Sequence, residues 1–290
     1  MGDRQPRAIP QSARGRSPTI SICHRSLVLM SVPRAISLVL IAAVLAGASL
    51  VPAAVAAPAA KAAPSASAPA KRPPADRPSA LHAPTARGAW TATVVETVVA
   101  RVQPGERAKA VRTLDTRAPF WGGPNVLLVL GSRMVADERW LDVLVKGMPA
   151  GSHGWIPARA AQLARTDRRI VVDLSERTLT FSRAGRRVLS TSVVVGAPET
   201  PTPLGQFAVD AIAKEPPGSL LGPRVLALVA YSRALARYQG GIPQAAIHAA
   251  DQLGDPLGTA ASHGCVRAPQ TVVNRLLTLA PRGTPVLIQR

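Results

Sequence analysis

The hexapeptide Ser262-His263-Gly264-Cys265-Val266-Arg267 places a cysteine two residues after a histidine and two residues before an arginine. Cysteine acts as a nucleophile in its thiolate form, so a working cysteine needs a group that lowers its pKa or accepts its proton. Histidine is the usual partner. If the segment is extended, His263 lies on the same face as Cys265, because alternate residues of a strand share a face. The hexapeptide therefore indicates a cysteine nucleophile.

Other groups near the hexapeptide suit the same chemistry. A second histidine, His248, ends a short apolar run, and a strand ending there could bring it beside the thiol. Gly264 lets the backbone approach a substrate closely, and the N–H groups near Gly264 and Cys265 could stabilise an oxyanion. Arg267 is a fixed cation that could stabilise a thiolate or bind a substrate carboxylate.

The region around the hexapeptide, residues 168–290, is predicted to be rich in β-structure. Turns are predicted at 173–177 and 184–185, and residues 271–279 carry apolar side chains at helical spacing before Pro281. Short apolar runs predict strands at 170–174, 178–181, 188–195, 207–212, 225–229 and 285–289.

The hexapeptide resembles the active-site motif of the L,D-transpeptidase (YkuD) family. Three further segments resemble family motifs, in family order: TPTPLGQF at 200–207, the run from Gly240-Gly241 to His248, and GTPV at 283–286. The matches span about residues 168–289. The resemblance implies a β-rich catalytic domain at 168–290 with a short helix near its C-terminus.

The resemblance also implies roles for individual residues. Cys265 corresponds to the acylated nucleophile, and His248 to the general base and acid. The family breaks the amide between a stem peptide's third residue, a diamino acid, and a terminal D-alanine, and the side-chain amine of another peptidoglycan stem peptide then attacks the thioester. No metal, ATP or other cofactor is implied. The positions that shape the pocket and the oxyanion site fall on Ser262, His263, Gly264 and Arg267.

Two positions depart from the family pattern. Ala249 stands where glycine usually follows the first histidine, and Ala268 stands where a larger apolar residue is common. The backbone carbonyl at position 249 is thought to orient the imidazole. Alanine keeps that carbonyl, so the role survives if the φ angle of Ala249 is negative. Ala268 is expected to alter packing more than chemistry.

Four further polar residues lie near His248 in the sequence. Tyr231 and Tyr238 either form a flap that holds the donor peptide, as substrate-binding residues, or pack in the core. Asp251 and Asp255 follow His248 and are interpreted as turn residues.

Residues 90–165 predict a small, separate β module. Short apolar runs at 93–99, 126–130 and 140–145 are separated by proline and glycine. The stretches 140–143 (WLDV) and 154–157 (GWIP) resemble a bacterial SH3-like domain. All four tryptophans lie in this module and either fill its core or form a groove for wall glycans. We expect removal of residues 57–165 to leave the thiol chemistry intact and to weaken wall association.

The N-terminal region predicts export. An apolar run at 35–50 is followed by Ala54-Val55-Ala56, an A-x-A cleavage pattern, so residues 1–56 are predicted to be a signal peptide. Met30 is a possible true start. The run is short for a membrane span but could act as an uncleaved anchor if residues 51–60 extend it. Residues 57–88, rich in Ala and Pro, predict an extended linker. The predicted location is the cell wall or a periplasm-like space.

Composition and cysteine count narrow the function classes. The sequence has two cysteines, and signal cleavage would remove Cys23 and leave Cys265 as a single thiol. The net charge of +19 reflects either a GC-rich genome, which favours arginine codons, or attraction to anionic wall polymers. No nucleic-acid-binding signature is present.

Three alternatives remain open from the sequence. His248, His263 and Cys265 could supply three zinc ligands, although their spacing argues against it. With the same residues, water could attack the thioester, giving an L,D-carboxypeptidase or a crosslink hydrolase. The protein could also bind the cell wall without catalysis.

Overall fold

A computed structural model describes residues 20–21, 81–238 and 241–290, and the last two ranges belong to one compact unit. Apart from residues 20–21, the predicted signal peptide lies outside these residues, and so does most of the predicted linker. Within the described residues, no helix is long and apolar enough to span a membrane.

The first sheet has seven strands, all paired antiparallel, in the order β4-β3-β7-β6-β5-β2-β8. Its core contains Leu127, Leu141 and Ile156. Its elements are β2 (Ala89–Val94), β3 (Val98–Arg101), β4 (Ala110–Leu114), β5 (Val126–Val135), β6 (Glu138–Leu144), β7 (His153–Pro157), the 3-10 helix η1 (Ala158–Ala160) and β8 (Ala161–Thr166). The SH3-like resemblance of this sheet stays a prediction.

The sequence predictions for this first part need two corrections. The single strand predicted at 93–99 is two strands, β2 and β3, because residues 95–97 leave the sheet between them. The predicted linker also extends too far. Leu81 is buried, and its N–H donates a hydrogen bond to the Ser132 hydroxyl (2.8 Å), so the folded part begins before residue 88.

The second sheet is mixed and has nine strands, in the order β1-β15-β14-β13-β18-β9-β10-β11, with β17 also paired to β15. A separate parallel pair is formed by β12 (Val195–Gly196) and β16 (Ala260–Ser262). The strands of the large sheet are β1 (Ile20–Ser21), β9 (Arg168–Asp173), β10 (Thr178–Arg183), β11 (Arg186–Ser192), β13 (Gly205–Lys214), β14 (Arg224–Tyr231), β15 (Ile242–Ala249), β17 (Val266–Ala268) and β18 (Pro285–Gln289).

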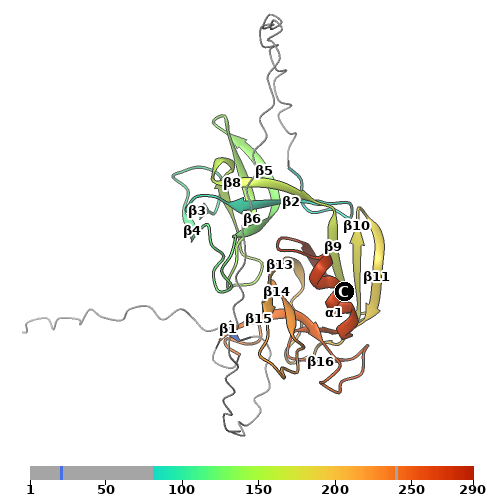
Figure 1. Ribbon diagram of the computed structural model, residues 1–290. Helices are drawn as coiled ribbons and strands as arrows, with labels where there is room; N and C mark the ends of the chain where they lie inside the picture. Colours follow the sequence, from blue (N-terminus) through green and yellow to red (C-terminus); the bar gives the residue numbers. More distant parts are fainter. Residues whose placement is uncertain (1–19, 22–80, 239–240) are drawn as a thin grey trace, which may run out of the picture. The chain divides into compact units, whose positions relative to one another are not determined.

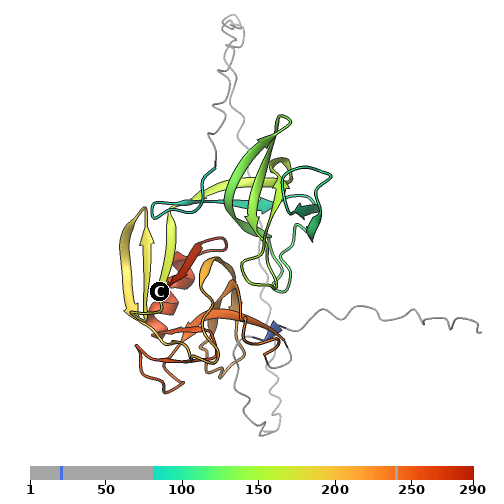
Figure 2. The ribbon, with the colours of Figure 1, turned by 180° about the vertical axis from the view of Figure 1, so that it is seen from behind.

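One end of this sheet is the antiparallel meander β9-β10-β11 (Figure 1), which Figure 2 shows from behind. The two predicted turns are confirmed. Ala184 and Gly185 both have positive φ, at 49° and 80°, which is the backbone that a two-residue hairpin loop requires. Asp173 accepts the N–H groups of Ser175 and Glu176 and closes the other turn.

Strands β14 and β15, which lie near the hexapeptide in the sheet, are buried on both faces. Strands β14 and β15 are apolar runs whose residues are almost all buried, as expected for strands covered on two sides. In the described part of the chain there is one α-helix, α1 (Gln270–Leu279), which packs on β14 and β15 and buries Val273 and Leu276. The predicted helix and the predicted strands at 207–212, 225–229 and 285–289 are confirmed within two residues at their ends.

Besides the separate core of the first sheet, the two sheets share a second hydrophobic core. Leu128 of β5 and Leu144 of β6 belong to the same buried cluster as Phe207 of β13 and Leu226 of β14. Gly283 approaches the first sheet so closely that a Cβ atom there would lie 2.7 Å from a methyl carbon of Val126. The predicted boundary between the modules therefore separates two sheets, but the shared core crosses it.

Candidate active site

Cys265 lies in a tight turn between β16 and β17. Ser262, the last residue of β16, accepts a hydrogen bond from the Gly264 N–H (3.1 Å) and donates one to the Cys265 carbonyl (2.5 Å) through its hydroxyl. Gly264 has a φ of 110°. The segment is therefore not extended, and the condition under which His263 and Cys265 would share a face is not met, because the chain bends between the exposed His263 and the buried Cys265.

The turn also changes the predicted oxyanion site. The Gly264 N–H already donates to Ser262 within the turn, so it does not serve as an oxyanion donor in this conformation. Ser262 is 1 % exposed and bonds to both sides of the bend. Its role here is to hold the shape of the turn that presents Cys265.

A Gly264→Ala variant is expected to lower the free energy of unfolding by about 1–3 kcal/mol, the usual cost of a residue held in a sparsely populated backbone region. The cost comes from the backbone, because the new Cβ would meet its nearest neighbours, the carbonyls of Thr200 and Pro201, at an ordinary 3.6–3.7 Å. Urea unfolding measures it. Gly131→Ala in β5 is the matched control, since its φ is not positive and no atom lies within 4 Å. Equal stability of the two variants would contradict the strained turn.

His248 is fully buried near the end of β15. Its Nδ1 lies 2.9 Å from the carbonyl oxygen of Ala249. A carbonyl only accepts, so Nδ1 carries the proton and Nε2 is the basic nitrogen of the neutral ring. The φ angle of Ala249 is not positive. The prediction that alanine keeps the orienting carbonyl is thus confirmed.

The strand register places His248 and Cys265 on one face of the sheet. β15 and β17 are parallel neighbours, with Ile247 opposite Val266 and His248 opposite Arg267. Cys265 directly precedes β17 and Ala246 directly precedes Ile247 on β15, and the two residues belong to one buried cluster. Ala246 and His248 are alternate residues of β15 and share a face. The register therefore brings the thiol and the imidazole to the same side.

The 200–207 segment packs against the turn that holds Cys265. The Thr200 hydroxyl donates to the Ser262 carbonyl (3.1 Å), and the Thr202 hydroxyl accepts from the Gly196 N–H (2.8 Å). Gly196 has no room for a side chain, because a Cβ there would lie 2.4 Å from the Thr200 carbonyl oxygen. Two of the motifs that the sequence places far apart are thus in direct contact.

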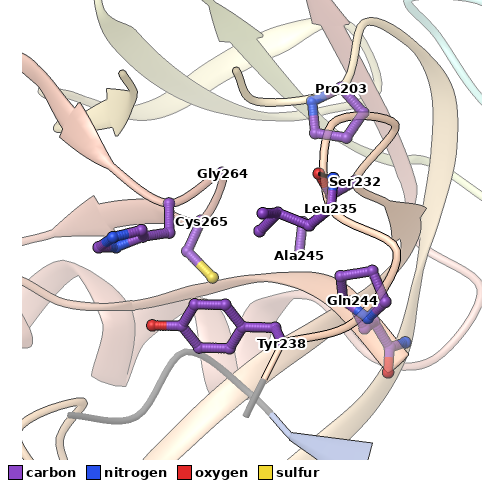
Figure 3. A pocket seen from close by; sticks show the side chains of 10 residues that line it. Pro203, Ser232, Leu235, Tyr238, Gln244, Ala245, Gly264 and Cys265 are labelled. Atoms are coloured by element: carbon purple, nitrogen blue, oxygen red, sulfur yellow. Dashed lines mark hydrogen bonds between the residues drawn. The ribbon is translucent and has the colours of Figure 1, made fainter. Parts of the chain in front are cut away.

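A cavity of about 260 Å³, counted with its open mouth, lies beside Cys265. Figure 3 shows the Cys265 sulfur directed toward the space between Leu235 and Tyr238. The rings of Tyr238 and His263 are 5.7 Å apart. The lining is mainly apolar, with a few polar groups, as in most small-molecule sites. It consists of Pro203, Ser232, Leu235, Tyr238, Pro243, Gln244, Ala245, His263, Gly264 and Cys265.

Sequence reasoning missed part of this lining. Ser232 and Leu235 lie after β14, and the Ser232 hydroxyl accepts the N–H groups of Ala234 and Leu235. Ser at the start of such a turn is a recognisable local signal. What it does not reveal is that the turn folds over Cys265.

Arg267 is paired with Asp255, and its side chain is 9 % exposed. The interpretation of Asp255 as a simple turn residue is therefore incomplete, because its carboxylate neutralises the arginine next to the nucleophile. Asp251 accepts the backbone N–H of Gln270 (2.8 Å) and so caps the first turn of α1. Arg267 thus lies next to the nucleophile, but its guanidinium group is already paired with the Asp255 carboxylate.

Of the two predicted substrate-binding tyrosines, only Tyr238 lines the cavity. Tyr231 is completely buried in β14, so its prediction as a substrate-binding residue is wrong. Burial, and then the negative charge of Asp210, raise the pKa of Tyr231 well above its ordinary value. A long apolar run such as β14 needs bulky side chains in the core, and Tyr231 supplies one.

Within the described residues, no three His, Cys, Asp or Glu side chains are arranged to hold a metal ion. His248, His263 and Cys265 therefore do not form the three-ligand set that the sequence left open. The bend at Gly264 accounts for this, since it separates the exposed His263 from the buried pair.

Comparison with known proteins places the site in a family. The L,D-transpeptidase catalytic domain (YkuD) matches residues 167–288. No curated protein matches the chain at a significant level.

Several solved structures are similar to the chain. A mutant of the Enterococcus faecium L,D-transpeptidase is 27 % identical, with 42 % of this chain and 49 % of that chain covered and a TM-score of 0.31. The catalytic domain of the E. faecium L,D-transpeptidase is 26 % identical, with 42 % and 97 % covered and a TM-score of 0.32. An L,D-transpeptidase from Mycobacterium tuberculosis is 17 % identical, with 53 % and 90 % covered and a TM-score of 0.35.

This chain spans about half the length of the first of these proteins. The family match covers the turn around Cys265, the strand that carries His248 and both neighbouring motifs. Residues 167–288 of this chain are an L,D-transpeptidase catalytic domain of the YkuD family.

Proposed function

We propose that the protein is an L,D-transpeptidase that crosslinks peptidoglycan stem peptides through a thioester on Cys265. One observation carries the proposal: the Ala249 carbonyl fixes the imidazole of His248, on the sheet face that also carries Cys265. A thiol next to a base of preset orientation is the arrangement that nucleophilic catalysis by cysteine requires.

In the first step, Nε2 of His248 takes the proton of the Cys265 thiol. The thiolate sulfur attacks the carbonyl carbon of the amide between the third stem residue and the terminal D-alanine. A C–S bond forms and the C–N bond breaks. The imidazolium returns the proton to the departing amine, so D-alanine leaves and the stem remains as a thioester.

In the second step, the side-chain amine of another stem attacks the thioester carbonyl. A C–N bond forms, the C–S bond breaks, and His248 relays the proton of the attacking amine to the departing thiolate of Cys265. The thiol and the neutral imidazole are thereby restored. Water in place of the amine would give the alternative products of a carboxypeptidase or a crosslink hydrolase.

The chemistry of the cavity lining is compatible with a peptide donor. Pro203, Leu235 and Ala245 give it apolar walls, while Tyr238 and His263 supply polar groups. A peptide suits such a lining, because apolar contacts bind it and a few polar groups orient it. In this proposal Tyr238 and His263 contact the donor and do not take part in proton transfer.

The proposed substrate lies outside the cytoplasmic membrane, so the proposal requires export. The predicted signal segment, residues 1–56, would supply it. The net charge of +19 supports attraction to anionic wall polymers. Fractionation of cells that express the full chain tests this, and retention in the cytoplasm would contradict it.

The deciding experiment incubates the full chain with a purified tetrapeptide stem and follows the intact protein by mass spectrometry. We expect an acyl-enzyme at Cys265, whose added mass equals the tripeptide stem less one water, together with free D-alanine. Crosslinked dimer should then accumulate. A tripeptide stem is the control, because it lacks the amide that the reaction breaks.

Two other results have clear meanings. Free tripeptide without dimer would assign the hydrolase alternative. No adduct on Cys265 with the tetrapeptide would remove the proposed function altogether.

A further inference from the structure

A buried ion pair joins the first sheet to the second. The Nζ atom of Lys146, which follows β6, lies 2.7 Å from Oδ1 of Asp210 in β13, and their side chains are 2 % and 0 % exposed. Burial lowers the pKa of Lys146, and the charge of Asp210 opposes that shift. Two charges removed from water in this way depend on each other, because either one alone would be an uncompensated buried charge.

The pair extends to a glutamine of the cavity wall. Oδ2 of Asp210 accepts a hydrogen bond from Nε2 of Gln244 (3.0 Å), which also donates to the Leu228 carbonyl (2.7 Å). Oε1 of Gln244 accepts from the indole N–H of Trp121 (3.0 Å). A carboxylate only accepts and an indole only donates, so these two partners fix which way the amide points. Trp121 and Lys146 thus hold the two ends of the Asp210–Gln244 unit.

This unit touches the site on two sides. Gln244 lines the cavity beside Cys265 (Figure 3), on the strand that carries His248 four residues later. Trp121 packs against the buried cluster that contains Cys265 and Ala246. Trp121, in the loop between β4 and β5, and Lys146, after β6, therefore reach elements that set the position of the thiol or of its base.

We propose that Lys146 and Trp121 are positioning residues for the Cys265 site, acting through Asp210 and Gln244 on strand β15. Loss of the Lys146 charge leaves the Asp210 carboxylate buried without a counter-ion, so the carboxylate and the Gln244 amide must rearrange. Loss of the indole N–H leaves Oε1 of Gln244 without its donor. Either change shifts the strand that carries His248, and a misplacement of about 1 Å can cost about 100-fold in rate.

The test measures alkylation of Cys265 by iodoacetamide across a pH series, in the full chain with Cys23→Ser so that Cys265 is its single cysteine. The inference rests on the proposed function of the Cys265 site. Alkylation needs no stem peptide, so its result is independent of whether the protein acts on stem peptides. We expect Lys146→Met and Trp121→Phe to lower the alkylation rate at least about tenfold or to move the apparent pKa of the thiol.

Arg159→Met is the matched control. Arg159 is a first-sheet arginine that pairs with Glu106 and Glu138 on the surface, with its side chain 57 % exposed. Exposed pairs of this kind contribute little, so the alkylation rate should stay within about twofold of the parent.

A double variant, Lys146→Met with Asp210→Leu, separates positioning from stability. It removes both buried charges and should recover the melting temperature lost in Lys146→Met. The altered alkylation profile should persist, because Gln244 still lacks its Asp210 partner. Recovery of the parental profile in the double variant would overturn the proposal. Unchanged alkylation in Trp121→Phe, which keeps an aromatic ring in place, would also overturn the proposal. If Lys146→Met does not fold, the Trp121→Phe result alone decides whether the proposal stands.

Discussion

A Cys265→Ser variant is expected to form no acyl-enzyme with a tetrapeptide stem and to lose at least about 10³-fold in turnover, as is usual when a nucleophile is removed. A serine hydroxyl is a far weaker acid than a thiol, so Nε2 of His248 cannot ionise it to a comparable extent. Intact-protein mass spectrometry measures the acyl-enzyme, and chromatography of the released stems measures turnover.

The variant needs two checks, because Cys265 is completely buried in an apolar cluster. Thermal unfolding shows whether the serine hydroxyl disturbs that cluster, and Cys265→Ala, which buries no hydroxyl, should be equally inactive and well folded. Cys23→Ser is the matched control and should keep full turnover, since Cys23 is the other cysteine of the sequence. Turnover retained in Cys265→Ser would refute the assignment of the nucleophile.

The local features of the site were predictable from the sequence. Short-range rules place the Ala184–Gly185 hairpin and the helix α1, and the structure has both. The carbonyl at Ala249 orients His248 although alanine replaces glycine, because the role belongs to the backbone and not to the side chain. The hexapeptide resembles the L,D-transpeptidase (YkuD) motif, and the same family's catalytic domain matches residues 167–288.

Features that depend on distant contacts were not predictable. Lys146 and Asp210 are 64 residues apart in the sequence, and each looks like an ordinary surface charge there. Pairing of Arg267 with Asp255 depends on how the loop after His248 returns to β17. The sequence left Tyr231 open between the core and the substrate site, because a tyrosine in an apolar run has the same local signal whether it faces the core or a cavity. Only the three-dimensional fold distinguishes these cases.

Removal of the first sheet is the second change with a large expected effect, and the structure argues against the sequence-based expectation that residues 57–165 are dispensable for the thiol chemistry. Leu128 and Leu144 of that sheet lie in the same core as Phe207 and Leu226. Each fully buried leucine contributes about 1.5–3 kcal/mol, whereas the net stability of a domain is about 5–15 kcal/mol. Loss of the shared core is therefore expected to remove cooperative folding.

The ion pair contributes less to this loss than the apolar surface does. Without the first sheet, water reaches Asp210, so its charge is hydrated and the penalty of an unpaired buried carboxylate largely disappears. The exposed core has no such compensation. Residues 167–290 alone should thus lack a cooperative thermal transition, and Cys265 should alkylate at the rate of an unfolded thiol. A chain that begins at Leu81 is the matched control and should behave like the full chain, because it keeps both sheets. If residues 167–290 instead unfold cooperatively and keep the parental alkylation profile, the two sheets are independent and the positioning role of Lys146 and Trp121 falls with the shared core.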